Sequence, residues 1–197
     1  MTGAALAALC VPALLAGSVI AHVTGGAVAA APTLVTVGER QAHVATGFTV
    51  SPGRVVTVAH VLEGDTATVR GDDGIARRAV VVRRDDRLDL ALLAVAGLPP
   101  GHAFVPAGTR LIVHHDGATA ALPARVVRRI DARVRTAGAR GLVRRPGLEL
   151  AAAVAAGDSG APVVRDGRLA GVVFARSRER PGVAYAVDAT ALARLTR

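Results

Sequence analysis

Lysine and tryptophan are absent from this chain of 197 residues, and cysteine occurs once, at Cys10. The net charge of +9 therefore comes from arginine alone. The arginines recur one or two at a time along valine-rich segments and form no dense basic block, which is typical of a solvated face. A nucleic-acid-binding protein would need a recognition helix or clustered basic and aromatic positions. We therefore expect no nucleic-acid partner.

Aromatic residues make up only 2% of the sequence, although 51% of it is hydrophobic. The core must then be built from valine, alanine and leucine, and valine-rich runs favour strands. Because Cys10 lies in an apolar leader, the chain beyond that leader holds no disulfide, and cysteine usage does not report the redox compartment. The length suits one catalytic unit of a single domain or two small lobes.

The amino-terminal segment from Ala4 to Val23 carries no charged side chain. It is long enough to span a bilayer, and small residues follow it, so residues 1–31 form either a signal peptide, cut after Ala29 or Ala30, or a retained membrane anchor. An export signal usually opens with basic residues, which are missing here, and both alternatives stay open. We expect a secreted, periplasmic or cell-envelope protein, with membrane or cell-wall association through this segment if it is retained.

Residues 32–197 predict an all-β domain, because short valine-rich runs alternate with Gly, Pro and Asp. We place an N-terminal lobe at about 32–98, a C-terminal lobe at about 106–187 and a helix at 188–197, begun by Asp188 as its N-cap. The Gly- and Pro-rich stretch 96–108 is the expected linker. The predicted strands are 43–50, 54–58, 66–70, 79–83, 88–95, 110–114, 124–130, 148–154, 161–164, 168–174 and 183–187.

Serine is scarce, and only Ser159 lies between glycines, in the sequence Gly157-Asp158-Ser159-Gly160. Flanking glycines let the backbone turn sharply and expose the hydroxyl. A serine hydroxyl is a poor nucleophile at its free pKa, so hydrolysis needs a general base within hydrogen-bond reach and an acid that orients that base. We therefore interpret Ser159 as a candidate nucleophile.

His60 is the candidate base, since it closes the apolar run that starts at Val55. Asp89 is the candidate orienting acid, because a lone carboxylate among apolar residues is costly unless it has a partner. Asp85 and Asp86 compete for this role, but their arginine-rich setting favours solvent. Each assignment has a plainer alternative: a satisfied core histidine, an ion pair of Asp89 with Arg87, or an ordinary turn around Ser159.

The segments Thr57-Val58-Ala59-His60, Asp89-Leu90-Ala91-Leu92 and Gly157-Asp158-Ser159-Gly160 together resemble trypsin-like serine proteases in order and rough spacing. The match covers most of residues 40–187. It is similar above all to disulfide-free bacterial envelope proteases, such as HtrA-like catalytic domains and the acid-resistance periplasmic protease of mycobacteria. Thr46-Gly47-Phe48 matches the opening of their domain.

The resemblance implies two six-stranded antiparallel β-barrels of the chymotrypsin type and a short C-terminal helix. It implies that Ser159, His60 and Asp89 form a catalytic triad and that the N–H groups of Gly157 and Ser159 form an oxyanion hole. Neither a metal nor an organic cofactor is expected, and the substrates are proteins or peptides. Substrate-binding positions align with Ala153, Phe174 and Arg176, and the alanine favours small or apolar residues before the scissile bond.

Some positions depart from the family pattern. In trypsin-like zymogens, cleavage exposes an Ile or Val amino terminus that pairs with the acid before the nucleophile. No arginine followed by such a terminus precedes Gly47, so Asp158 needs another partner. We therefore expect activity without trypsin-style activation. Ala161 replaces a usual glycine, while Phe174 and Arg176 stand where Ser and Gly are usual. These changes leave two alternatives to a peptidase: an impaired protease-like module that binds the cell envelope, or an esterase that uses the same triad.

Overall fold

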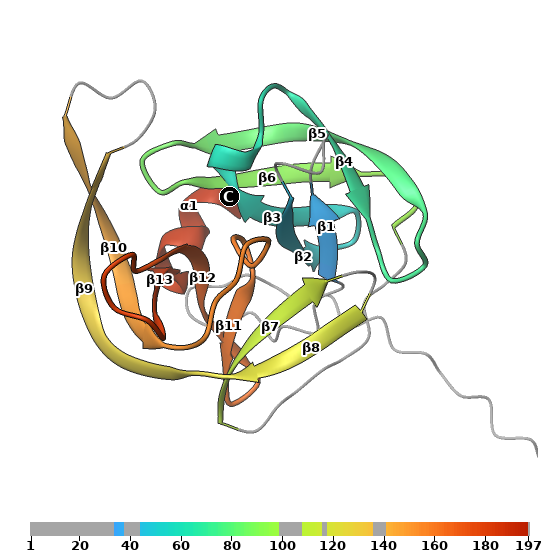
Figure 1. Ribbon diagram of the computed structural model, residues 1–197. Helices are drawn as coiled ribbons and strands as arrows, with labels where there is room; N and C mark the ends of the chain where they lie inside the picture. Colours follow the sequence, from blue (N-terminus) through green and yellow to red (C-terminus); the bar gives the residue numbers. More distant parts are fainter. Residues whose placement is uncertain (1–33, 38–43, 99–107, 116–117, 136–140, 197) are drawn as a thin grey trace, which may run out of the picture.

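The computed structural model describes residues 34–37, 44–98, 108–115, 118–135 and 141–196. The expected leader, 1–31, and most of the expected linker lie outside these residues. Within the described part, no helix is both long and apolar enough to cross a membrane. The expected all-β fold is confirmed, and its strands form two curled antiparallel sheets, one per lobe (Figure 1).

The first lobe is a closed barrel with the strand order β1-β2-β3-β6-β5-β4. Its strands alternate buried and exposed side chains, as in β4, or are buried almost throughout, as in β3 and β6. A short 3₁₀ segment, η1, follows β3 directly at Ala59–Val61. The strands are β1 (Leu34–Val37), β2 (Ala45–Ser51), β3 (Arg54–Val58), β4 (Thr66–Arg70), β5 (Ala76–Asp85) and β6 (Leu90–Val95).

The second lobe is a seven-stranded sheet with the order β8-β7-β11-β12-β13-β10-β9, where a six-stranded barrel was expected. Only Ala124 separates β8 from β9, and this long stretch of chain pairs with β7 at one end and with β10 at the other. The two edge strands of the sheet, β8 and β9, are thus joined by the continuous chain and not by backbone hydrogen bonds to each other. The strands are β7 (Thr109–His115), β8 (Ala118–Pro123), β9 (Arg125–Arg135), β10 (Leu142–Ala151), β11 (Pro162–Arg165), β12 (Arg168–Arg176) and β13 (Val183–Asp188).

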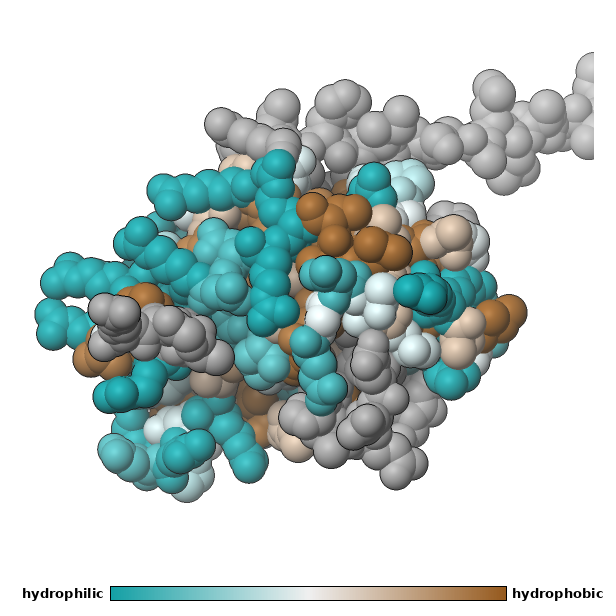
Figure 2. All heavy atoms as spheres, turned by 90° about the horizontal axis from the view of Figure 1, so that it is seen from above, coloured by the Kyte–Doolittle hydropathy of each residue, from teal (hydrophilic) through white to brown (hydrophobic). Residues whose placement is uncertain are grey.

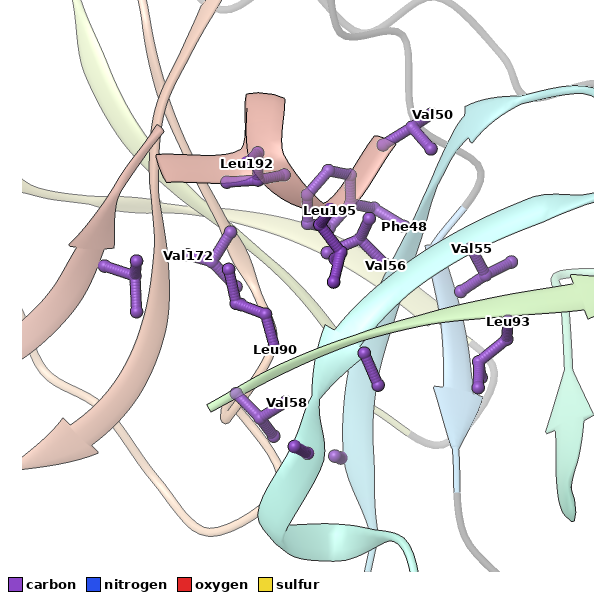
Figure 3. Close-up of a cluster of buried hydrophobic side chains, with 14 of the residues drawn as sticks. Phe48, Val50, Val55, Val56, Val58, Leu90, Leu93, Val172, Leu192 and Leu195 are labelled. Atoms are coloured by element: carbon purple, nitrogen blue, oxygen red, sulfur yellow. The ribbon is translucent and has the colours of Figure 1, made fainter. Parts of the chain in front are cut away.

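The C-terminal segment packs against the first barrel. Asp188 caps it as expected, because its side chain accepts a hydrogen bond from the backbone N–H of Thr190. A 3₁₀ turn, η2 (Ala189–Leu192), leads into α1 (Ala193–Thr196). Leu192 and Leu195 are buried in one cluster with Phe48 of β2 (Figure 3). The helix therefore ties the end of the second lobe to the core of the first.

Most arginines lie on the surface, as the sequence pattern indicates. All the arginines of β9 are exposed: Arg125, Arg128, Arg129, Arg133 and Arg135. Seen from above, much of the molecular surface is hydrophilic, with a smaller hydrophobic group near its centre (Figure 2). One arginine of the neighbouring strand β10, Arg145, is an exception, since it is 2% exposed.

Candidate active site

His60 lies in η1, immediately after β3, and its contacts fix both its backbone and its ring. The backbone N–H donates to Asp89 Oδ1 at 2.9 Å, and ring Nδ1 lies 2.9 Å from Asp89 Oδ2. A carboxylate only accepts hydrogen bonds, so Nδ1 carries the proton of this contact. The neutral ring then presents the lone pair of Nε2 away from Asp89. This is the tautomer that a general base for a hydroxyl needs.

Asp89 stands at the turn just before β6, and not inside the strand as the sequence suggested. Its φ of +59° lies in the left-handed region, which few residues other than glycine adopt. The peptide carbonyl of Asp89 also accepts from Ala59 N–H at 3.1 Å. Such backbone strain persists only where the surroundings enforce it, and it is frequent at active sites. Here both carboxylate oxygens and the carbonyl are directed at the His60 segment.

The competing acids are placed elsewhere. Asp85 accepts from the backbone N–H of Leu88 at 2.9 Å, and exposed Asp86 forms an ion pair with Arg84. Neither contact involves the histidine. The solvent-facing interpretation of Asp86 agrees with this placement.

The turn that carries Ser159 is held against the first barrel by Thr46. Thr46 N–H donates to the Ser159 carbonyl at 2.8 Å, and Thr46 Oγ1 donates to the Gly157 carbonyl at 2.9 Å. In turn, Thr57 Oγ1 in β3 donates to the Thr46 carbonyl at 2.9 Å. Thr57 precedes His60 by three residues, so these contacts bring the serine turn beside the strand that ends at the histidine.

A glycine is required at position 160, because the serine turn lies so close to Thr46 of β2. The φ of Gly160 is +89°, and a Cβ atom added there would lie 1.9 Å from the Thr46 carbonyl oxygen. Any side chain would push the serine turn away from β2. The glycine after Ser159 thus has a steric reason beyond the flexibility that the sequence indicated.

Asp158 is buried, with 1% exposure, and its Oδ2 accepts from Ala155 N–H at 2.7 Å. This contact braces the loop that leads into Gly157, whose φ is +96°. Within the described residues, the N–H groups of Gly157 and Ser159 donate to no protein acceptor, and the Ser159 hydroxyl makes no hydrogen bond to His60. Catalytic hydrogen bonds are often loose without substrate and tighten only in its presence.

A pocket of about 600 Å³ is lined by residues that follow β10 and by the connection from β12 to β13. One of them, Ala155, donates its N–H to Asp158, the residue before Ser159. Ala153 and Arg176 both line the pocket, so two of the three aligned substrate-binding residues meet there. The described residues of its wall include no carboxylate. The lining residues are Ala152, Ala153, Val154, Ala155, Arg176, Ser177, Arg178, Pro181, Gly182 and Val183.

Phe174, the third aligned position, does not line this pocket. Phe174 is 8% exposed, and its ring stacks on Tyr185, with ring centroids 6.4 Å apart. The guanidinium of Arg145 covers the ring, with Cζ 4.6 Å from the centroid. Phe174 therefore belongs to a buried layer next to Asp89.

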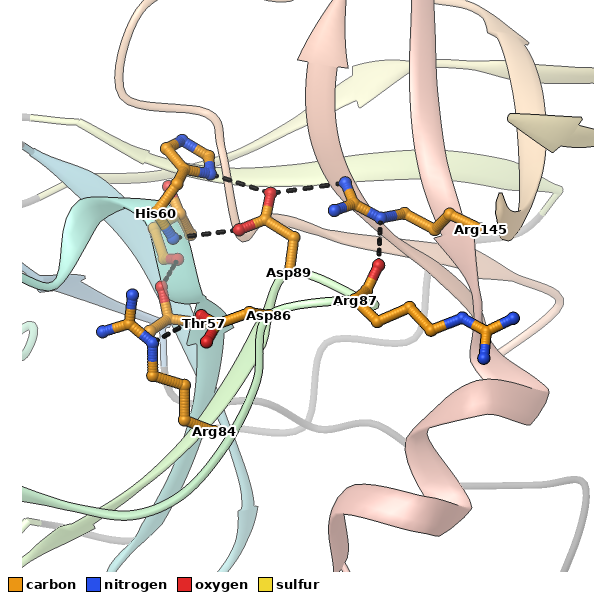
Figure 4. A network of polar contacts seen from close by, with 8 residues as sticks. Thr57, His60, Arg84, Asp86, Arg87, Asp89 and Arg145 are labelled. Atoms are coloured by element: carbon orange, nitrogen blue, oxygen red, sulfur yellow. Dashed lines mark hydrogen bonds and ion pairs between the residues drawn. The ribbon is translucent and has the colours of Figure 1, made fainter. Parts of the chain in front are cut away.

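Arg145 is the residue that the sequence analysis missed. From β10 it reaches Asp89 Oδ2 with Nη1 at 3.4 Å and donates from Nε to the Arg87 carbonyl at 3.0 Å (Figure 4). Burial lowers the pKa of Arg145, and the carboxylates of Asp89 and Asp85 act in the opposite direction. His60, Asp89 and Arg145 thus form one row of polar contacts. In the described part of the chain, no cluster of His, Cys, Asp or Glu is arranged to hold a metal ion.

Comparison with known proteins agrees with this architecture. A family model described as a trypsin-like peptidase domain matches residues 45–172. The chain belongs to the trypsin-like peptidase family. The matched span includes His60, Asp89 and Ser159.

Among trypsin-like peptidases, the chain is similar to serine protease Rv3671c of Mycobacterium tuberculosis, with 37% identity over 140 residues. The alignment covers 66% of this chain but 35% of the relative, so the chain spans about a third of the length of the curated relatives it matches. The crystal structure of the active form of the Rv3671c protease superposes with a TM-score of 0.73 at 30% identity and covers 83% of this chain and 79% of that one. The MamO protease domain from Magnetospirillum magneticum, at 22% identity and a TM-score of 0.67, shares the fold; that match covers 84% of this chain and 96% of that one.

Proposed function

We propose that this chain is a serine endopeptidase in which Ser159 attacks the scissile carbonyl, His60 acts as general base and then acid, and Asp89 orients His60. The observation that carries the proposal is the double contact of Asp89 with the backbone and the ring of His60, at 2.9 Å each. Membership in the trypsin-like peptidase family supports it, and so do the relatives named as serine proteases.

The proposed chemistry uses the His60–Asp89 contacts. His60 Nε2 accepts the hydroxyl proton as Ser159 Oγ bonds to the carbonyl carbon, and the Nδ1–H···Asp89 bond stabilises the imidazolium that forms. In this proposal the N–H groups of Gly157 and Ser159 bind the resulting oxyanion, and such donors contribute about 3 kcal/mol each. The imidazolium then protonates the leaving amine, and water hydrolyses the acyl-enzyme by the same steps in reverse.

The pocket supports a preference for small or apolar side chains before the scissile bond, because alanines and Val154 form much of its wall. A peptide-library profile tests this preference. Enrichment of Ala, Val or Leu at that position is expected, and efficient cleavage after Lys or Arg would contradict it.

We further propose that the protein acts outside the cytoplasm, since residues 4–23 are uncharged. Cell fractionation tests this placement.

The nucleophile is tested with a serine-directed fluorophosphonate probe. Wild type should be labelled, whereas Ser159→Ala and His60→Ala should not. Ser51→Ala is the matched control, because Ser51 ends β2 outside the contacts described above, and it should be labelled like wild type. Unlabelled wild type would favour a binding module of the cell envelope. Labelling together with ester but no peptide hydrolysis would identify an esterase.

A further inference from the structure

Arg145 links the two lobes directly behind the candidate triad. It belongs to β10 of the second sheet, yet its guanidinium bonds to the Arg87 carbonyl and to the Asp89 carboxylate, both of which lie between β5 and β6 of the first barrel. Its side chain is 3% exposed, and its planar face rests on Phe174. The oxygen that it contacts, Asp89 Oδ2, is the one that receives His60 Nδ1.

These contacts set the geometry of the carboxylate. The Arg87 carbonyl and the Phe174 ring fix the plane of the guanidinium, and a guanidinium is rigid, so Nη1 has one position. Asp89 Oδ2 therefore lies between two donors that come from different lobes. Without Arg145, Oδ2 would keep only the His60 ring, and the carboxylate could tilt about its remaining hydrogen bond from the His60 backbone N–H to Oδ1, taking the imidazole with it.

A buried arginine needs such a reason, because taking a charge out of water is costly unless it is paired and hydrogen-bonded. Arg144, the preceding residue, shows the usual arrangement, since it is exposed and pairs with exposed Asp131. The two adjacent arginines of β10 thus point to opposite faces of the strand. Only the buried one reaches the His60 contact.

We propose that Arg145 is a positioning residue for the peptidase: it holds Asp89 Oδ2 in the orientation that directs His60 toward Ser159. This inference rests on the proposed function. It assigns Arg145 no contact with substrate. The competing view is that Arg145 only clamps the lobes together.

The test compares Arg145→Met and Arg145→Lys with the matched variants Arg144→Met and Arg144→Lys. Methionine keeps the packing on Phe174 but donates nothing, and lysine keeps the charge but loses the rigid fork. We expect kcat to fall roughly 100-fold in R145M and roughly 10-fold in R145K, with KM within about twofold of wild type, because a misplaced catalytic group slows the chemical step. Both Arg144 variants should keep wild-type kcat. Thermal unfolding shows which variants are folded at the assay temperature.

The Asp89→Asn background separates positioning from clamping. If Arg145 acts through Asp89, its substitution should reduce the rate of probe labelling in wild type but cause no further loss in D89N. A clamp between the lobes would cause the same loss in both backgrounds and would overturn the proposal. R145K allows this comparison even if R145M does not fold. Wild-type kcat in folded R145K would also overturn it.

Proton NMR of histidine-labelled protein gives a readout that does not require turnover. The Nδ1–H of His60, assigned by its loss in His60→Gln, should give a low-field signal in wild type and in S159A. That signal should shift or broaden in R145K and stay unchanged in R144K. If wild type is neither labelled nor active, the proposed function fails, while the NMR comparison still decides whether Arg145 positions Asp89. An unchanged His60 signal in R145K would overturn the inference.

Discussion

Two buried carboxylates, Asp89 and Glu149, are both held by arginine, but in opposite ways. Asp89 gives one oxygen to the His60 backbone and the other to the His60 ring and to buried Arg145. Glu149, on β10, pairs with Arg128 and Arg180, whose side chains are 64% and 50% exposed. Asp89 thus lies between buried Arg145 and the half-exposed ring of His60, whereas Glu149 is neutralised from the solvent side. We therefore expect the first arrangement to serve the proposed chemistry and the second to serve stability.

The largest effect is expected when each of the two carboxylates is replaced by an amide of the same shape. This pair of changes tests whether Asp89 serves activity and Glu149 serves stability. In D89N an amide replaces the carboxylate that receives His60 Nδ1–H, which favours the wrong tautomer, and kcat should fall roughly 10⁴-fold. In E149Q, kcat should stay within twofold of wild type. Steady-state kinetics with a peptide chosen from the library profile measures both. Comparable losses in the two variants would refute the division.

The His60–Asp89 pairing was predictable from sequence, because a lone carboxylate beside apolar residues needs a partner. The strand that leads to His60 was predicted at 54–58 and is observed as Arg54–Val58. In both cases the apolar residues next to the position in the sequence show that it is buried.

Arg145 was not predictable in the same way, because it lies among many arginines that are solvated and its partner is 56 residues away along the chain. Strand alternation contains a weak signal: Arg144 and Pro146 are exposed, while Arg145 and Gly147 are buried. Phe174 was assigned to the substrate site for a related reason. Alignment gives its position on β12 but not the guanidinium that covers its ring.

The pH dependence of stability should differ between wild type and E149Q. Hydrogen bonds from Arg180, and secondarily from Arg128, lower the pKa of Glu149, against a raising effect of burial. A lowered folded-state pKa adds stability that is present above the unfolded value, about 4.3 for glutamate, and lost as the pH falls through the folded value. Wild type should therefore have a higher Tm than E149Q at pH 7, and the gap should close in acid below about pH 4.

Thermal unfolding followed by circular dichroism between pH 2 and pH 7 measures this gap. Asp131→Asn is the matched control, since Asp131 is exposed and pairs with exposed Arg144. Exposed pairs add little stability, so D131N should follow wild type across the range. A gap between wild type and E149Q that widened on acidification would have the wrong sign for this account.

The smallest expected effect distinguishes the two arginines of Glu149. Arg180 bonds to both oxygens of Glu149 and donates to the Tyr185 hydroxyl at 2.8 Å, whereas Arg128 makes one contact. Arg180→Met should therefore lower Tm by about 1–3 °C, and Arg128→Met by less.

The same two variants test whether the Glu149 cluster is separate from the Asp89 cluster. Tyr185 stacks on Phe174, and Phe174 contacts Arg145, so the clusters are joined by an aromatic pair. Stacked rings carry no hydrogen bond that would orient Asp89, and R180M should keep kcat within about twofold of wild type. A loss of kcat in R180M that disappeared in the R145K background would show instead that the aromatic pair transmits position from Glu149 to Asp89.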